Sequence, residues 1–173
     1  TFNFGYDVVD DIAENDPDRR AMMWCNPEGE EHLFTFADMK RWSDKTANYL
    51  AAHGVGKGDM VMVILRRHYQ FWFVATALAK LGAVMVPATF MLKEHDLEYR
   101  LNGASIKAVI CTSIGTIAQV VDNVVDRCPS VEHLFLGLMK KANDALKKYF
   151  ARNKKKKKAF VEQLKVVRGN KPV

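Results

Sequence analysis

The chain has 173 residues, is 49% hydrophobic and carries a formal net charge of +6. This length suits one domain with a sizeable core, and the chain lacks the run of about eighteen apolar residues that a transmembrane helix needs. The first residues are acidic rather than basic, which argues against a signal peptide and for a cytoplasmic location.

The first third of the chain is expected to form a short helix, a hairpin and a longer helix. In order, these are a helix over Tyr6–Asn15, strands over Arg20–Asn26 and Glu31–Phe34, and a helix over Thr35–His53. Pro17 disfavours continuation of the first helix, and Thr35 with Asp38 three residues later is typical of a helix N-cap. The apolar face of the longer helix is expected to contain Met39, Trp42, Ala47, Tyr49 and Leu50.

A strand, a helix and a second strand follow within about thirty residues and form the centre of the chain. Met60–Leu65 is an apolar run of the length expected for a buried strand. The next segment repeats its apolar residues at helical spacing and stops at Gly82, where a left-handed residue often closes a helix. Ala83–Pro87 is a second apolar strand, so this stretch predicts a βαβ crossover and a parallel sheet covered on both faces.

Strands and helices continue to alternate as far as Leu136. The expected elements are a helix over Lys93–Asn102, a strand over Ile106–Cys111, a helix over Ile117–Arg127 and a strand over Val131–Leu136. This alternation predicts an α/β fold with an open, mostly parallel sheet flanked by helices.

The end of the chain differs in charge from the rest. Residues 139–173 carry a net charge of +11, including the five consecutive lysines Lys154–Lys158, whereas residues 1–138 carry −5. We therefore expect a partial α/β domain over 1–138 and a lysine-rich, basic helical C-terminal tail over 139–173.

Neither the cysteines nor the histidines indicate a metal site. Cys25, Cys111 and Cys128 are widely spaced and form no CxxC pair, so neither a zinc site nor a disulfide framework is expected. They are instead expected to be buried and reduced. The five histidines contain no HExxH pattern.

Two turns in the middle of the chain are candidates for phosphate contact. Gly54–Asp59 lacks the GxxxxGK[ST] spacing and precedes a strand, so a helix end followed by a tight turn is expected. Arg66–Tyr69 follows the first central strand, at the carboxyl edge where α/β sheets bind ligands. Its two arginines fit a phosphate contact, but a solvated loop is the simpler interpretation.

Two blocks of sequence resemble the AMP-forming acyl-activating superfamily, which includes the acyl-CoA synthetases, the adenylation domains of peptide synthetases and firefly luciferase. FTFADM, at 34–39, is similar to the family's opening motif, and LAKLGAVMVP, at 78–87, is similar to its second core motif. The spacing of the blocks agrees as well. FWF in the helix, PAT after the strand and DLEYRLNGASIKAVI resemble the medium-chain and acetyl-type acyl-CoA synthetases. The resemblance covers about residues 2–136.

The resemblance implies an enzyme of fatty acid metabolism, a ligase that forms an acyl-adenylate from a carboxylic acid and ATP and then transfers the acyl group to coenzyme A. It also implies Mg²⁺ and a downstream loop, roughly TSGTTGxPK, whose backbone N–H groups hold the ATP phosphates. Thr112–Thr116 lacks the second glycine and the Pro-Lys pair of that loop, so an ordinary turn is expected there. The chain is therefore expected to be the N-terminal portion of a synthetase, catalytically incomplete alone, with no catalytic residue and no bound cofactor of its own.

The coenzyme A channel is the one part of the family's site that the resemblance assigns to this chain. In the medium-chain branch the segment after the proline lies near that channel, which corresponds by position to Thr89, Met91 and Lys93. The residues alone favour structural roles, with Thr89 as a turn-capping hydroxyl and Lys93 as a solvated helix start.

The expected partners follow from the same resemblance. They are the remaining subdomains of a synthetase or a second copy of the chain, together with a carboxylic acid substrate. The alternative is a non-enzymatic interaction module whose basic tail contacts nucleic acid or another anionic partner. A solvated charged helix is the simpler interpretation of Lys154–Lys158.

Overall fold

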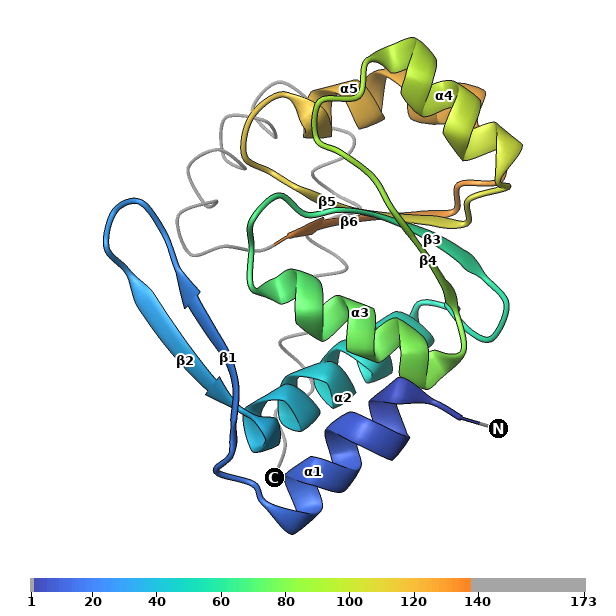
Figure 1. Ribbon diagram of the computed structural model, residues 1–173. Helices are drawn as coiled ribbons and strands as arrows, with labels where there is room; N and C mark the ends of the chain where they lie inside the picture. The colour runs from blue at the N-terminus through green and yellow to red at the C-terminus, as the bar shows by residue number, and fades with distance from the viewer. Residues whose placement is uncertain (1, 138–173) are drawn as a thin grey trace.

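A computed structural model describes residues 2–137, and the strands and helices expected as far as residue 136 are all present (Figure 1). In order, they are the π-helix η1 (Gly5–Asp10), α1 (Asp11–Asn15), β1 (Arg20–Cys25), β2 (Glu31–Thr35), α2 (Phe36–Ala52), β3 (Met60–Ile64), α3 (Gln70–Leu81), β4 (Val84–Pro87), α4 (Glu94–Gly103), β5 (Ala108–Thr112), α5 (Ile117–Val124), the 3₁₀-helix η2 (Val125–Arg127) and β6 (His133–Gly137). The expected lysine-rich tail over 139–173 lies outside the described residues.

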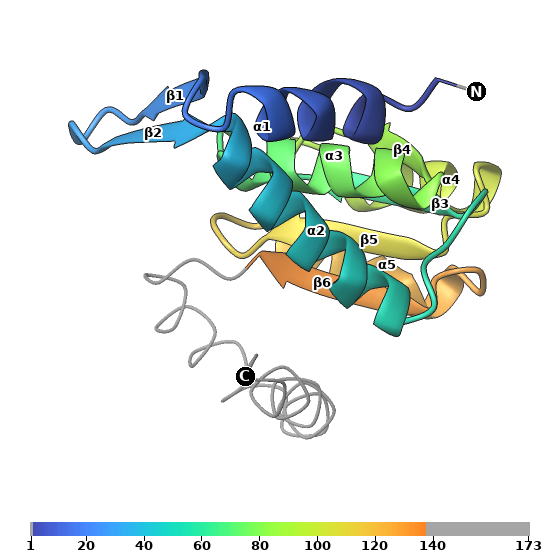
Figure 2. The same cartoon turned by 90° about the horizontal axis from the view of Figure 1, so that it is seen from below.

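Four parallel strands form the central sheet in the order β4-β3-β5-β6. The chain enters at β3, moves outward to β4 and then crosses back past β3 to β5. This reversal places α2 and α3 on one face of the sheet and α4 and α5 on the other (Figures 1 and 2). The expected fold class, an open parallel sheet flanked by helices, is confirmed.

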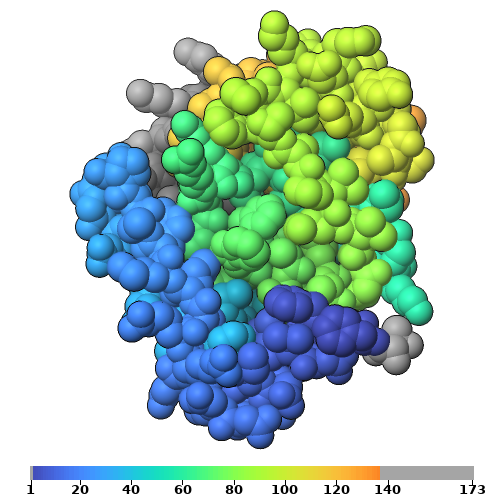
Figure 3. Space-filling model, in the orientation of Figure 1, coloured from blue at the N-terminus to red at the C-terminus, as the bar shows by residue number. Residues whose placement is uncertain are grey.

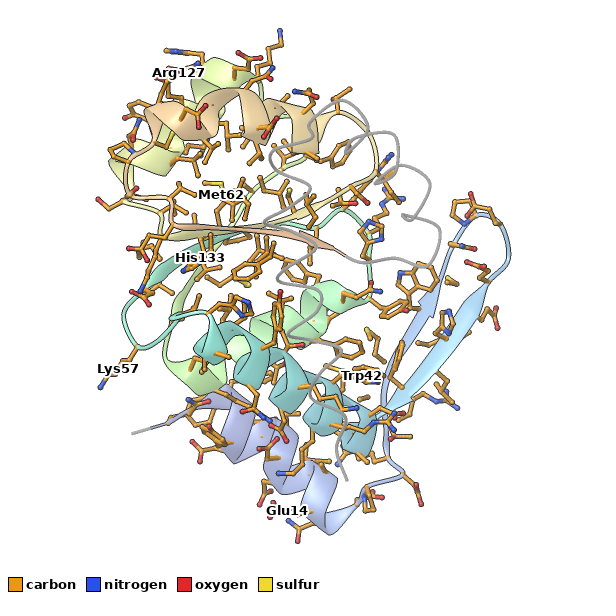
Figure 4. All side chains as sticks on the ribbon, turned by 180° about the vertical axis from the view of Figure 1, so that it is seen from behind. Glu14, Trp42, Lys57, Met62, Arg127 and His133 are labelled. Atoms are coloured by element: carbon orange, nitrogen blue, oxygen red, sulfur yellow. The ribbon has the colours of Figure 1, made fainter. Side chains whose placement is uncertain are left out.

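Each face of the sheet has its own hydrophobic core. Side chains along β3 point alternately to the two faces and so contribute to both cores. Val61 and Val63 pack toward α2 and α3, whereas Met62 and Ile64 pack toward α4 and α5. Figure 4 shows Met62 between the sheet and these last two helices. Because both faces are covered, the strand is apolar throughout, as is typical of a parallel sheet.

The N-terminal helices η1 and α1 form an outer layer of the molecule. Buried ion pairs of Lys80 hold this layer to α2 and α3. The Lys80 side chain is 2% exposed, and its Nζ lies 2.6 Å from both Asp10 Oδ1 and Asp44 Oδ1. Lys40 Nζ approaches the other carboxylate oxygen of Asp10 at 3.2 Å. A Cβ at Gly5 would lie 2.5 Å from Lys80 Cγ, so η1 can cross α3 this closely only with glycine there. The N-terminal helix is therefore fixed by charge as well as by apolar packing.

The helix ends expected at Thr35 and Gly82 are confirmed. The Thr35 side chain accepts a hydrogen bond from the Asp38 backbone N–H, and the Asp38 side chain accepts one from Thr35 N–H, which forms a capping box. Gly82 closes α3 with φ +67°, a left-handed conformation that glycine adopts without strain.

Two residues expected in the interior are on the surface. Trp42 is 40% exposed, because the buried stripe of α2 passes beside it. The stripe consists of Met39, Ser43, Ala47 and Leu50. The small side chains of Ser43 and Ala47 in this stripe fit a close approach to α3, while the Trp42 ring stacks beside that of Phe73, with ring centroids 6.2 Å apart. Cys25 is exposed as well, whereas Cys111 and Cys128 are buried free thiols as expected.

Candidate functional site

The loops that follow the parallel strands gather at one edge of the sheet. The carboxyl ends of β3, β4 and β5 are aligned, since Val63 pairs with Pro87 and Ile64 with Cys111. The strand order reverses between β3 and β5, and in open α/β sheets ligands bind in the crevice at such a switch point. This carboxyl edge is therefore the candidate functional site.

A hydrogen bond spans the switch point. His68 Nε2, in the loop after β3, lies 3.0 Å from Thr112 Oγ1 at the end of β5. The same Thr112 hydroxyl accepts a hydrogen bond from Ile114 N–H at 3.1 Å. Burial, with a smaller contribution from the Arg66 charge, lowers the pKa of His68 below its usual value. A neutral imidazole therefore joins the two loops near pH 7.

Acidification is expected to destabilise the protein through His68. Because the folded pKa lies below the ordinary value of 6.5, its contribution is complete above pH 6.5 and is lost as pH falls through the folded pKa. Replacing His68 with glutamine should remove this part of the pH dependence. Urea unfolding of both proteins between pH 7.5 and 5 measures it. The same slope in both proteins would contradict the assignment.

The residues assigned to the coenzyme channel lie in the loop between β4 and α4. Thr89 is exposed, and its Oγ1 accepts a hydrogen bond from Met91 N–H at 3.3 Å. Met91 is 72% exposed, and Lys93 is an exposed N-cap residue of α4 that makes no side-chain cap bond. The structure thus places all three on one surface loop, and the turn-capping role considered for Thr89 is also present.

The structure shows a contact that the sequence did not predict. The Arg66 guanidinium carbon lies 4.5 Å from the centre of the Phe90 ring, so the loops after β3 and β4 touch beside Thr89. The predicted βαβ unit could have indicated that these two loops meet. Its strands, β3 and β4, are parallel neighbours, and adjacent parallel strands bring the loops that follow them together.

The two glycine turns have structural roles, as expected. Residues 113–116 link β5 to α5, and Gly115 adopts φ +82° there. The Gly54–Asp59 turn lies at the opposite, amino edge, where Lys107 Nζ contacts Asp59 Oδ2 at 2.9 Å. This ion pair and a hydrogen bond from Gly56 N–H hold the pKa of Asp59 below its usual value. Figure 4 shows Lys57 of the same turn pointing away from the molecule.

An aromatic cluster attaches the β1–β2 hairpin beside the site. Trp24 Nε1 donates a hydrogen bond to the Arg67 carbonyl at 2.7 Å, and the Trp24 and Tyr69 rings meet edge to face. The ring of Phe34 lies 5.0 Å from that of Tyr69. Figure 3 shows the hairpin on the surface, protruding at the side of the molecule. The hairpin thus supports the loop that carries Arg66 and Arg67.

The described part of the chain shows no metal centre, and one of its buried thiols is kept protonated. Across residues 2–137, no group of three or more His, Cys, Asp or Glu side chains is placed to hold a metal ion. Burial raises the pKa of Cys111 to about 12, so this thiol stays protonated at neutral pH. Within the same range, none of the helices has the length and apolarity needed to cross a membrane.

The fold and the carboxyl-edge loops define an α/β protein of the class that binds ligands at the ends of parallel strands. A family described as AMP-binding enzyme matches residues 9–170, and the chain belongs to this family. The match continues past residue 138, so the border expected there remains a prediction.

Its relatives are acyl-CoA synthetases. Acyl-coenzyme A synthetase ACSM5, mitochondrial, from Homo sapiens is 35% identical over 137 residues, covering 76% of this chain and 23% of the human protein. Acyl-coenzyme A synthetase ACSM4, mitochondrial, from Mus musculus is 33% identical over 137 residues, covering 76% of this chain and 23% of the mouse protein. These matches confirm the resemblance to the N-terminal portion of acyl-CoA synthetases.

Solved structures agree with this assignment. A fatty acyl CoA synthetase from Mycobacterium tuberculosis has a TM-score of 0.69 and 26% identity, covering 84% of this chain and 27% of the solved one. A long-chain-fatty-acid-CoA ligase from Archaeoglobus fulgidus has a TM-score of 0.70 and 22% identity, covering 78% of this chain and 27% of the solved one. At this identity, the likeness supports the fold alone. The chain spans about a quarter of the length of the proteins it matches.

Proposed function

We propose that this chain is the N-terminal α/β portion of an enzyme that activates a carboxylic acid with ATP and transfers the acyl group to coenzyme A. The observation that supports this most strongly is the family match, which includes both sequence blocks of the resemblance. FTFADM forms the capping box of α2, and LAKLGAVMVP forms the end of α3 and the whole of β4. In this proposal the 173 residues alone do not catalyse the reaction, because they lack the phosphate-binding loop of the family.

Within that function, we assign the loop between β4 and α4 to the coenzyme A channel. Thr89 offers a hydroxyl, Met91 an apolar surface and Lys93 a cation, and all three are exposed on one short segment. ATP and Mg²⁺ would be held mainly by residues outside this chain. The three side chains therefore contribute to the second half-reaction rather than to adenylate formation.

The channel assignment goes beyond the expectation from the sequence that this chain binds no cofactor by itself. It requires weak binding of coenzyme A to the 173-residue chain, and Lys93→Gln should weaken this binding about threefold, the effect of losing an exposed charge contact. Isothermal titration calorimetry at low salt measures it. Lys57→Gln is the matched control, because Lys57 is also an exposed lysine but lies at the opposite edge of the sheet. Equal affinities for the wild-type chain and Lys93→Gln, or no saturable binding, would refute the channel assignment.

The partners and the compartment remain proposals of the same kind. Contact with further subdomains of a synthetase is favoured over a self-dimer or a nucleic-acid complex, because relatives of this chain are several times longer. The nucleic-acid alternative depends on residues 139–173, which lie outside the described part of the chain. Cytoplasmic location also remains a prediction, and the human and mouse relatives named above are mitochondrial.

A further inference from the structure

A chemically labile dipeptide lies in the last turn of α4. Asn102 is the one asparagine in the 173-residue sequence that glycine follows, and both Asn102 and Gly103 are exposed. An asparagine amide before glycine is prone to deamidation, because no Cβ shields the backbone nitrogen that attacks it. We propose that Asn102 is a site of spontaneous deamidation, gated by opening of this turn, and that the reaction weakens the attachment of α4 to α5 and η2. The turn leads into β5 at the amino edge of the sheet, so the site is separate from the carboxyl-edge loops.

The reaction needs no co-reactant other than water. The Gly103 nitrogen attacks Cγ of Asn102, the new C–N bond closes a succinimide ring, and the side-chain amide leaves as ammonia with the proton of the Gly103 N–H. Water then adds to one of the two ring carbonyls and cleaves its bond to the ring nitrogen, which takes up a proton from the water. The product is an aspartate, or an isoaspartate in which the main chain runs through the side-chain carboxyl carbon.

The native turn protects the dipeptide while it is closed. Asn102 and Gly103 are the last two residues of α4, and the attack requires the Asn102 ψ angle to leave the helical range. The Ile106 N–H donates to the Leu101 carbonyl at 2.9 Å, and the Ser105 N–H donates to the Asn102 carbonyl at 3.1 Å. These two bonds form a Schellman helix end, which must open before the reaction proceeds.

The same turn is weak enough to open locally. Ser105 has φ +47°, a left-handed conformation that costs free energy for a residue with a side chain. Gly103 lies within the helix, where glycine is less stabilising than alanine. An open cavity of about 280 Å³ between α4 and β4 borders Gly103, so the turn lacks packing on that side. Leu101 and Ile106 are fully buried on either side of the turn, which confines the opening to the residues between them.

Asn102 is among the residues that hold α4 to its neighbours. Glu94, Glu98 and Asn102 recur at intervals of four, which places them on one face of the helix. Asn123 donates to Glu94 at 2.6 Å, Arg127 Nε donates to Glu98 at 2.8 Å, and Asn102 Nδ2 donates to the Arg127 carbonyl at 3.3 Å. Figure 1 shows α4 and α5 side by side over the same face of the sheet. A change at Asn102 therefore acts on the contact between these helices.

Deamidation removes the donor from this contact. The amide becomes a carboxylate that faces the Arg127 carbonyl, which is also an acceptor, so repulsion replaces the hydrogen bond. The new negative charge lies four residues after Glu98 and at the C-terminal end of a helix, and both positions disfavour it. The isoaspartate product also lengthens the main chain and so misaligns the two bonds that close the turn.

Peptide mapping by mass spectrometry, after incubation of the 173-residue chain at mildly alkaline pH, tests the proposal. Asn102 is expected to convert to both aspartate and isoaspartate in the folded chain, about tenfold more slowly than in guanidinium chloride, since the turn must first open. No conversion in the folded chain over a period in which the unfolded chain converts would overturn the proposal.

Two substitutions separate the chemistry from the opening. A Cβ at Gly103 would have no atom within 4 Å, so Gly103→Ala fits the folded turn. It should slow the reaction about tenfold with and without denaturant, because the methyl group shields the attacking nitrogen. Ser105→Gly relieves the left-handed strain and should slow the reaction about fivefold in the folded chain alone. An unchanged rate in Gly103→Ala would overturn the succinimide route, and an unchanged rate in folded Ser105→Gly would overturn the gating.

Hydrogen exchange measures the weakened attachment of α4. Asn102→Asp reproduces one product and should speed exchange at the end of α4 and in η2 about fivefold. Asn48→Asp is the matched control, since Asn48 is an exposed asparagine on α2, and it should leave exchange in α4 unchanged. Equal exchange in the wild-type chain and Asn102→Asp would contradict the role of Asn102 in holding α4.

Discussion

Replacing Lys80 with methionine is expected to lower the free energy of unfolding by about 3 kcal/mol, the effect of breaking a buried ion pair by removal of one partner. Methionine has a volume similar to that of lysine. The loss of stability therefore measures the effect of removing the charge rather than the effect of a cavity. It leaves the Asp10 side chain, which is 10% exposed, with Lys40 at 3.2 Å as its remaining ion-pair partner. Because this pair connects η1 to α3, the N-terminal helix should lose protection from hydrogen exchange first.

Urea unfolding measures this loss, with Lys45→Met as the matched control. Lys45 is also on the α2–α3 side of the molecule, but it is exposed and contacts only the Trp42 ring among the interactions identified for it. Its replacement should change stability by less than about 0.5 kcal/mol. Equal effects of the two substitutions would show that the buried ion pair does not hold the outer layer.

Leu78→Ala should lower the free energy of unfolding by about 3 kcal/mol, within the range measured for buried leucines. Leu78 is fully buried on α3 and packs against the sheet residues Val61 and Val63 in the same core cluster. Close-packed neighbours cannot collapse fully into the space that the removed atoms leave, so a cavity adds to the lost apolar burial.

Leu33→Ala is the control for this substitution. Leu33 lies on the outward face of the hairpin and is 56% exposed, so its truncation should cost less than about 0.5 kcal/mol. Chemical denaturation of both variants gives the comparison. A loss at Leu78 no larger than at Leu33 would contradict the role of α3 as the covering helix of the sheet.

The local signals in the sequence were sufficient for the individual strands and helices and for the fold class. Thr35 with Asp38, Gly82 and the apolar run of β3 each depend on neighbours a few residues away, and each is found as expected. The βαβ pattern also implied the parallel pairing of β3 and β4. The order of all four strands needed the structure, because the side of β3 on which β5 pairs is not encoded in local periodicity.

Contacts between distant residues were beyond sequence reasoning. Lys80 stands among apolar residues on α3, and the partner that makes its burial possible, Asp10, is 70 positions away. Trp42 looked like a core residue because it is large and apolar, yet the smaller Ser43 occupies the buried stripe. At the candidate site, the resemblance named Thr89, Met91 and Lys93, while the contact of Arg66 with Phe90 required the geometry of two loops.

The exchange of ³²P between pyrophosphate and ATP, dependent on a carboxylic acid, tests the central claim most directly. The 173-residue chain should give only background with short- and medium-chain acids, since its sequence contains no loop of the TSGTTGxPK type to hold a triphosphate in reactive geometry. Acid-dependent exchange clearly above background would show that these residues form a complete adenylating site and would contradict the account.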